Sequence, residues 1–123
     1  DLASIGKGIG GHKGKVTLVF GQPLEAEFDS PEAVAKALDE AIVSQYRLHA
    51  SNVAAYIELY GVDAWLVAKQ ELQLMPNQQV IPELDVKSSA RLTARLDDLA
   101  AEEKEWLLRM YANPVTHKLE LLG

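Results

Sequence analysis

The sequence predicts a mainly α-helical fold (α+β) of about five helices, with one or two β-strands near the N-terminus. After residue 29, apolar residues recur every three or four positions. Capping residues, Pro and Gly divide that region into segments of helical length. One run rich in β-branched residues precedes it. We therefore expect two parts: residues 1–28, a Gly-rich loop and the terminal strand of an adjoining domain, and residues 29–123, a helical C-terminal domain.

The main strand is predicted over Lys15–Phe20, where four of six residues are β-branched or aromatic and turn signals lie on both sides. Leu24–Phe28 alternates apolar and acidic residues and is expected as a second, shorter strand. The glycine-rich residues 1–14 predict a mobile loop, because glycine loses the most backbone entropy on ordering.

The predicted strand Lys15–Phe20 needs a neighbour, because its apolar residues fall on both faces and a lone strand leaves its backbone groups unpaired. In the isolated chain this segment can pair with the same strand of a second copy, form a hairpin with Leu24–Phe28, or remain disordered. We favour the homodimer, because Gln22-Pro23 is a weak hairpin turn and Pro23 removes a donor.

The helical region begins with a clear start signal, Ser30 as N-cap and Pro31 in the first turn. An apolar stripe follows at every fourth position, formed by Val34, Leu38, Ile42 and Tyr46. Ser51 or Asn52 is expected to cap a second helix, which Gly61 ends.

The later helices are predicted from similar signals. Asp63 is expected to cap a third helix, Ala64–Met75, which Pro76 stops, and residues 77–87 read as a linker. Ser88 or Ser89 is expected to cap the next helix, which residues 100–112 continue or restart. Asn113-Pro114 is expected to open a short last helix to Leu122.

Composition restricts the function classes. Apolar content of 48% and charged content of 24% are those of an ordinary globular protein. The net charge of −6 argues against nucleic acid as a partner, since such binding depends on neutralising phosphates. The longest unbroken apolar runs, of which Ala64–Ala68 is one, are far too short to span a membrane. The absence of cysteine excludes disulfides and fits a cytoplasmic location.

No catalytic, cofactor-binding or metal site is predicted in this chain. Gly6–Gly11 matches the dinucleotide pattern G-x-G-x-x-G, but a strand follows it instead of preceding it. The three histidines, His12, His49 and His117, lack metal-ligand spacing. His49, near a predicted helix end, is expected to have a capping role, and His117, in the last helix, is expected to face solvent. Three further groups have structural interpretations. We interpret three serines as helix caps, Ser30, Ser51 and Ser88, and five acidic residues as a solvated helix face, Asp97, Asp98, Glu102, Glu103 and Glu105. Four large side chains are expected in the core or against a partner: Trp65, Trp106, Met110 and Tyr111.

Three segments carry a resemblance to a known family. Gly14–Leu24, which contains Phe20-Gly21-Gln22-Pro23-Leu24, looks like the late strand that closes the catalytic domain of bacterial glycerolipid acyltransferases, the lysophosphatidic acid acyltransferase-like proteins. Ser30–Asn52, with Tyr46-Arg47-Leu48 and Ser51-Asn52, resembles the helix that follows in a branch with an extended helical tail. Glu105–Val115 looks like the end of that tail. Together these segments extend the similarity over nearly the whole chain.

The family's catalytic signature, His-x-x-x-x-Asp, is absent from this sequence. The residues five positions after His12, His49 and His117 are Thr17, Ala54 and Leu122. The Glu-Gly-Thr/Ser-Arg type motif that binds the acceptor phosphate is also missing. The resemblance therefore transfers no catalytic residue, and by family order both motifs are expected upstream of Asp1.

The resemblance implies a C-terminal, non-catalytic region of a phospholipid-synthesis acyltransferase, which transfers an acyl chain from a thioester donor to a lysophospholipid-like acceptor. The implied partner is the upstream acyltransferase domain of the parent chain, in a membrane-associated protein, cytoplasmic or peripheral at the inner membrane. The alternative is a helical interaction or dimerisation module without enzymatic role. A reading frame that continues upstream through His-x-x-x-x-Asp favours the first function, and a start codon near Asp1 favours the second.

Overall fold

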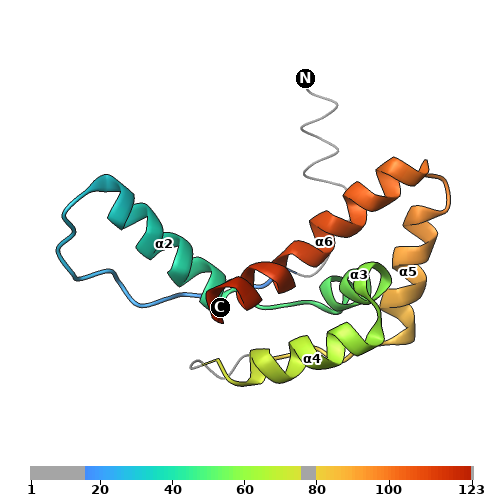
Figure 1. Ribbon diagram of the computed structural model, residues 1–123, viewed down its shortest axis with the longest axis horizontal. Helices are drawn as coiled ribbons and strands as arrows, with labels where there is room; N and C mark the ends of the chain where they lie inside the picture. Colours follow the sequence, from blue (N-terminus) through green and yellow to red (C-terminus); the bar gives the residue numbers. More distant parts are fainter. Residues whose placement is uncertain (1–15, 76–79, 123) are drawn as a thin grey trace.

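The structure, a computed structural model, describes residues 16–75 and 80–122. Within these residues the fold is mainly helical, as predicted (Figure 1). Five helices are present in the described residues: α2 (Pro31–Gln45), α3 (Ala50–Tyr60), α4 (Val62–Gln73), α5 (Val86–Leu96) and α6 (Ala101–Leu122). The predicted glycine-rich loop, Lys15, Pro76 and residues 77–79 lie outside the described residues.

The long helix α6 organises the fold. It runs diagonally across Figure 1 and packs against α3, α4 and, near its C-terminal end, α2. Helix α3 is the second organising element, because it also packs against α4 and α5. Helices α3 and α6 therefore form the centre of the domain, with the other three helices around them.

The core consists of two apolar clusters that share α3 and α6. Where α4 joins them, the buried side chains are Leu48, Val53, Trp65, Ala68, Leu72, Met75 and Val115. Where α5 joins them, the buried side chains are Ala54, Ala55, Leu92, Leu108 and Ala112. Three alanines in the second cluster keep the side-chain volume between α3 and α6 small, which allows the two helices to approach closely.

The first helix begins as predicted but packs less than predicted. The Ser30 hydroxyl accepts a hydrogen bond from the Ala33 N–H at 3.2 Å, and Pro31 occupies the first turn. However, α2 contains no buried residue. Leu38 and Ile42, from the predicted apolar stripe, are both exposed. The other two stripe residues, Val34 and Tyr46, are half-buried, and Tyr46 packs against the core, so only the middle of the stripe is left uncovered.

The predicted strands are not formed in the described residues. Residues 16–28 have no β-structure, and neither the strand continuing from Lys15 to Phe20 nor the hairpin with Leu24–Phe28 appears. Leu18 and Phe20 are 78% and 92% exposed. The physical reason is the lack of a neighbour: a strand is held by hydrogen bonds to another strand, and residues 16–75 and 80–122 contain no second strand beside this segment.

The predicted caps of α3 and α4 were wrong by a few residues. His49, not Ser51 or Asn52, is the N-cap of α3, and Asn52 occupies the third helical position of a capping box. The Asn52 Oδ1 atom accepts a hydrogen bond from the His49 N–H at 2.7 Å. Gly61 ends α3 as predicted, with a φ angle of 93°. Helix α4 then begins at once at Val62, which places Asp63 inside its first turn rather than at its cap.

The last two helices also differ from the prediction. Asp85 caps α5, and its carboxylate accepts a hydrogen bond from the Ser88 N–H, so neither predicted serine is the cap. A turn at residues 97–99 separates α5 from α6, so the helix restarts. No new helix opens at Pro114, which lies inside the continuous α6. Buried contacts of Ala112 before Pro114 and Val115 after it hold both sides of the helix in the core.

Candidate functional site

In the part of the chain that the structure describes, the residues with catalytic or metal-binding chemistry do not gather in one place. His49 caps α3, and His117 is exposed on α6, both as expected from the sequence. His12 lies outside the described residues. Among the residues that the structure describes, no group of three or more His, Cys, Asp or Glu side chains is arranged to hold a metal ion. The acidic residues at the start of α6 are exposed on its first turn, as predicted.

A buried lysine that is not among the residues predicted from the sequence joins α6 to α2. Lys118 is 0% exposed. Its Nζ donates hydrogen bonds to the carbonyl oxygens of Val43 at 2.7 Å and Ser44 at 3.3 Å, in the last turn of α2. It also lies 4.4 Å from the centroid of the Tyr46 ring. Burial disfavours the ammonium form and lowers the pKa of Lys118 to about 8.

Tyr46 makes the reciprocal connection from the end of α2 to α6. Its hydroxyl donates a hydrogen bond to the Pro114 carbonyl oxygen at 2.8 Å. Burial raises the pKa of Tyr46 to about 12. Lys118 also places a cation at the negative end of the α2 dipole. Because Lys118 is enclosed, we infer that Lys118 and Tyr46 hold α2 against α6 and do not form a reactive centre.

The signal for Lys118 is visible in the sequence once the helix is known. The inner face of α6 carries Leu108, Ala112 and Val115, and Lys118 falls one turn further along the same face. A charged residue within an apolar stripe indicates a buried partner on another element. The predicted break at Pro114 hid this pattern, because it assigned Lys118 to a separate short helix.

Asn52 links α3 to α6 in a similar way. Besides its capping bond to His49, its Nδ2 donates a hydrogen bond to the Tyr111 carbonyl oxygen at 2.8 Å. The side chain is buried, and its two hydrogen bonds satisfy both ends of the amide. Asn52 therefore sets the position of α3 along α6.

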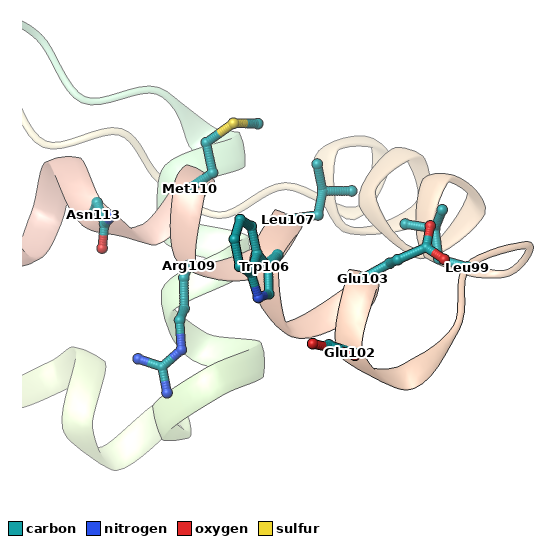
Figure 2. A pocket seen from close by; sticks show the side chains of 8 residues that line it. All are labelled: Leu99, Glu102, Glu103, Trp106, Leu107, Arg109, Met110 and Asn113. Carbon is teal, nitrogen blue, oxygen red and sulfur yellow. The ribbon is translucent and has the colours of Figure 1, made fainter.

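The largest of the surface grooves described here lies on the outer side of α6. It has a volume of about 790 Å³ and is lined by Leu99, Glu102, Glu103, Trp106, Leu107, Arg109, Met110 and Asn113. We call these eight residues the α6 groove. Figure 2 shows Trp106 at its centre, with Arg109 and Met110 toward one end and Glu102 and Glu103 toward the other.

The two tryptophans of the chain have opposite environments. Trp65 is 6% exposed and belongs to the core, whereas Trp106 is 75% exposed. Met110, one turn after Trp106, is also exposed. The sequence predicts these residues in the core or against a partner, and Trp65 lies in the core. A large exposed aromatic beside other apolar side chains is typical of interaction surfaces.

Two further grooves have a different character. One, of about 530 Å³, lies between the extended segment 17–24 and the uncovered face of α2. The other, of about 680 Å³, lies between α3 and α5 and is lined in part by Arg91, Arg95 and His49. Arg95 already donates a hydrogen bond to the Tyr111 hydroxyl, so one of the two guanidinium groups is engaged within the chain.

Comparison with protein-family models, with curated proteins and with solved structures found no match. The family resemblance therefore depends on the three sequence segments alone. Among the described residues, no helix is both long enough and apolar enough to cross a membrane.

Proposed function

We propose that this chain is the C-terminal, non-catalytic region of a glycerolipid acyltransferase-like protein of phospholipid synthesis. The observation that carries the proposal is the extended segment Val16–Phe20, which exposes large apolar side chains and has no strand beside it among the described residues. This is the same segment that resembles the closing strand of the family's catalytic domain. In the parent protein it would add to the edge of that domain's sheet, where its backbone groups gain partners.

The uncovered face of α2 supports the same proposal. Leu38 and Ile42 face the groove that also contains Val19 and Leu24 of the extended segment. The segment and the helix therefore present one continuous apolar surface to a neighbour. An upstream domain that received the strand would cover the α2 stripe as well, and the buried area would stabilise both at about 25 cal/mol per Å².

The chemistry is proposed to belong to the upstream domain. There a His-x-x-x-x-Asp pair would activate the acceptor hydroxyl, with the His as general base and the Asp orienting it. The parent would transfer an acyl chain from a thioester to a lysophospholipid-like acceptor, in the cytoplasm or at the inner membrane. The described part of this chain would contribute packing and orientation rather than reacting groups.

The test compares this chain with the parent protein encoded by the full reading frame. We expect the frame to contain His-x-x-x-x-Asp upstream, and the parent to cleave acyl-carrier or coenzyme A thioesters in the presence of lysophosphatidic acid. This chain alone should give no turnover above background. A frame without the motif, or turnover by this chain that is lost on mutating one of its residues, would refute the proposal.

A pair of matched variants tests the proposed strand within the parent. Leu18→Lys places a charge in the strand, whereas Leu74→Lys changes a similarly exposed leucine at the end of α4; the two side chains are 78% and 81% exposed here. We expect Leu18→Lys to lower the parent's melting temperature and activity, and Leu74→Lys to leave both unchanged. Equal effects of the two variants would count against insertion of this segment into the sheet.

A second candidate function is favoured by the α6 groove, which lies on the opposite face of α6 from its buried residues. A helical interaction module needs such an exposed apolar surface, and it needs no catalytic residues. The two functions are compatible, because a C-terminal region can also serve in assembly.

A further inference from the structure

The charges of the α6 groove are arranged in a way that restricts its partner. Helical geometry of about 100° and 1.5 Å per residue places Glu102 and Arg109 on the same flank of Trp106, on opposite sides of it along the axis. Arg109 lies about 4.5 Å toward the C-terminus, and Glu102 lies about 6 Å toward the N-terminus. A partner must therefore offer an acid at one end of this flank, a cation at the other, and an apolar centre.

Two classes of surface fit this pattern poorly. The groove contains Glu102 and Glu103, and Glu105 lies beside Arg109. Anionic membrane lipids and nucleic acids present only negative charge, so either surface would meet repulsion along most of the groove. A protein surface that carries both charge signs is the chemistry that remains.

We propose that the occupant of the α6 groove is the α6 groove of a second copy, in antiparallel orientation about a two-fold axis near Trp106. A two-fold axis there brings Arg109 of one copy to within about 1.5 Å, along the helix axis, of the level of the partner's Glu102, on the same flank. The two Trp106 rings stack at the centre, and each Met110 lies one turn from the partner's Trp106. Each copy supplies both charges that the other requires.

The ion pair that Arg109 makes within its own chain is consistent with this arrangement. Arg109 donates to the Glu105 carboxylate at 2.8 Å and 3.1 Å, with both side chains largely exposed. A guanidinium has five donors, so it can keep Glu105 and add the partner's Glu102. The cis pair holds Arg109 along the helix, which reduces the side-chain entropy lost on association.

The expected dimer is weak, because one face of one helix buries less than a standard protein interface. We expect association in the micromolar range or weaker. This inference rests on the second proposed function, an interaction module, and is independent of the acyltransferase proposal. It also differs from pairing through Lys15–Phe20, and the variants below separate the two interfaces.

The experiment is sedimentation velocity of the 123-residue chain over a wide concentration range, with fluorescence quenching of Trp106 by acrylamide as a second readout. We expect a monomer–dimer equilibrium, with quenching that falls as the dimer forms. Trp106→Lys removes the central anchor and should raise the dimer Kd by roughly 30-fold or more, the size of a hot-spot effect. Val67→Lys, at an exposed apolar position on α4, should leave the Kd unchanged.

A charge exchange tests the orientation. Arg109→Glu and Glu102→Arg should each raise the Kd, and the double variant should restore it, because the pair then re-forms across the axis with its signs reversed. Far-ultraviolet circular dichroism checks that each variant is folded.

Three results would overturn the proposal. They are a monomer at every concentration, a dimer that persists in Trp106→Lys, and a double variant no better than the singles. A dimer lost in Leu18→Lys but kept in Trp106→Lys would place the interface in the N-terminal segment instead. None of these results bears on the upstream motif or on the parent's activity, so failure here is distinguishable from failure of the acyltransferase proposal.

Discussion

The buried Lys118 should make the protein more stable at alkaline pH. An unfolded chain holds its lysine proton up to the ordinary pKa of 10.5, whereas burial lowers the pKa of Lys118 in the folded state to about 8. Between these values the unfolded state binds more protons than the folded state. The free energy of unfolding therefore rises with pH from about 8 to about 10.5, as the cost of burying the ammonium disappears.

The magnitude follows from the size of the pKa shift. The difference 10.5 − 8, at 1.36 kcal/mol per unit, corresponds to about 3 kcal/mol as an upper figure. Tyr46 acts in the opposite direction at higher pH. Its pKa is raised from 10.0 to about 12, so the folded state keeps a proton that the unfolded state loses, and stability falls again above about pH 10. The combined contribution of Lys118 and Tyr46 to stability is thus expected to be largest near pH 10.

The assay is urea unfolding at pH 7, 8, 9 and 10, followed by the fluorescence of the buried Trp65. Lys118→Met should flatten the rise between pH 8 and 10, whereas Lys36→Met, at an exposed side chain of α2, should keep it. The comparison uses the pH dependence within each variant, so a loss of packing in Lys118→Met that is the same at every pH does not enter. A flat profile in the unmodified chain, or the same rise in Lys118→Met, would show that Lys118 does not cause the pH dependence.

Two further substitutions test the backbone. Pro114→Ala should stabilise the protein by about 1–3 kcal/mol, because Pro inside a helix costs about 3 kcal/mol and part of that returns as unfolded-state entropy. Pro31→Ala, in the first turn of α2, is the control, and thermal melting measures the stability of both variants. A lower melting temperature in Pro114→Ala than in the unmodified chain would contradict the expectation. Gly61→Ala should destabilise by about 1–3 kcal/mol, because its φ of 93° and ψ of 163° suit only glycine. No atom lies within 4 Å of the added Cβ, so an unchanged melting temperature would mean that the backbone relaxes without cost.

The sequence predicts local features of this fold better than tertiary ones. Ser30 and Pro31 specify the start of α2 because capping depends on residues within one turn. Gly61 ends α3 because a positive φ favours glycine wherever it occurs. The same local signals favour Ser51 or Asn52 as the N-cap of α3 and give His49 only a capping role at an unspecified helix end, because Asn52, whose side chain accepts from the His49 N–H, is itself a good cap residue.

The wrong predictions occur where contacts distant in sequence decide the outcome. The local rule ends a helix at Asn113-Pro114, but Ala112 and Val115 are both buried against other helices, so α6 continues through the proline. Periodicity also could not separate Trp65 from Trp106, because both lie at helical spacing beside leucines. Which helix face is covered depends on how α3, α4 and α6 pack, and the sequence patterns around Trp65 and Trp106 do not specify that packing.

The distribution of buried and exposed apolar residues separates a part of the molecule that stabilises itself from a part that needs a neighbour. Helices α3 to α6 enclose two apolar clusters between them, so they supply their own stabilisation. Helix α2 and the extended segment before it bury almost nothing against that unit, and the Lys118 and Tyr46 hydrogen bonds fasten only the end of α2. A helix of 15 residues is marginal by itself, so α2 should be the first helix to exchange its amide protons in the isolated chain. Hydrogen exchange that is slower in α2 of the parent protein than in this chain would identify the missing neighbour as part of the parent, whereas equal exchange would leave the α2 stripe for a different partner.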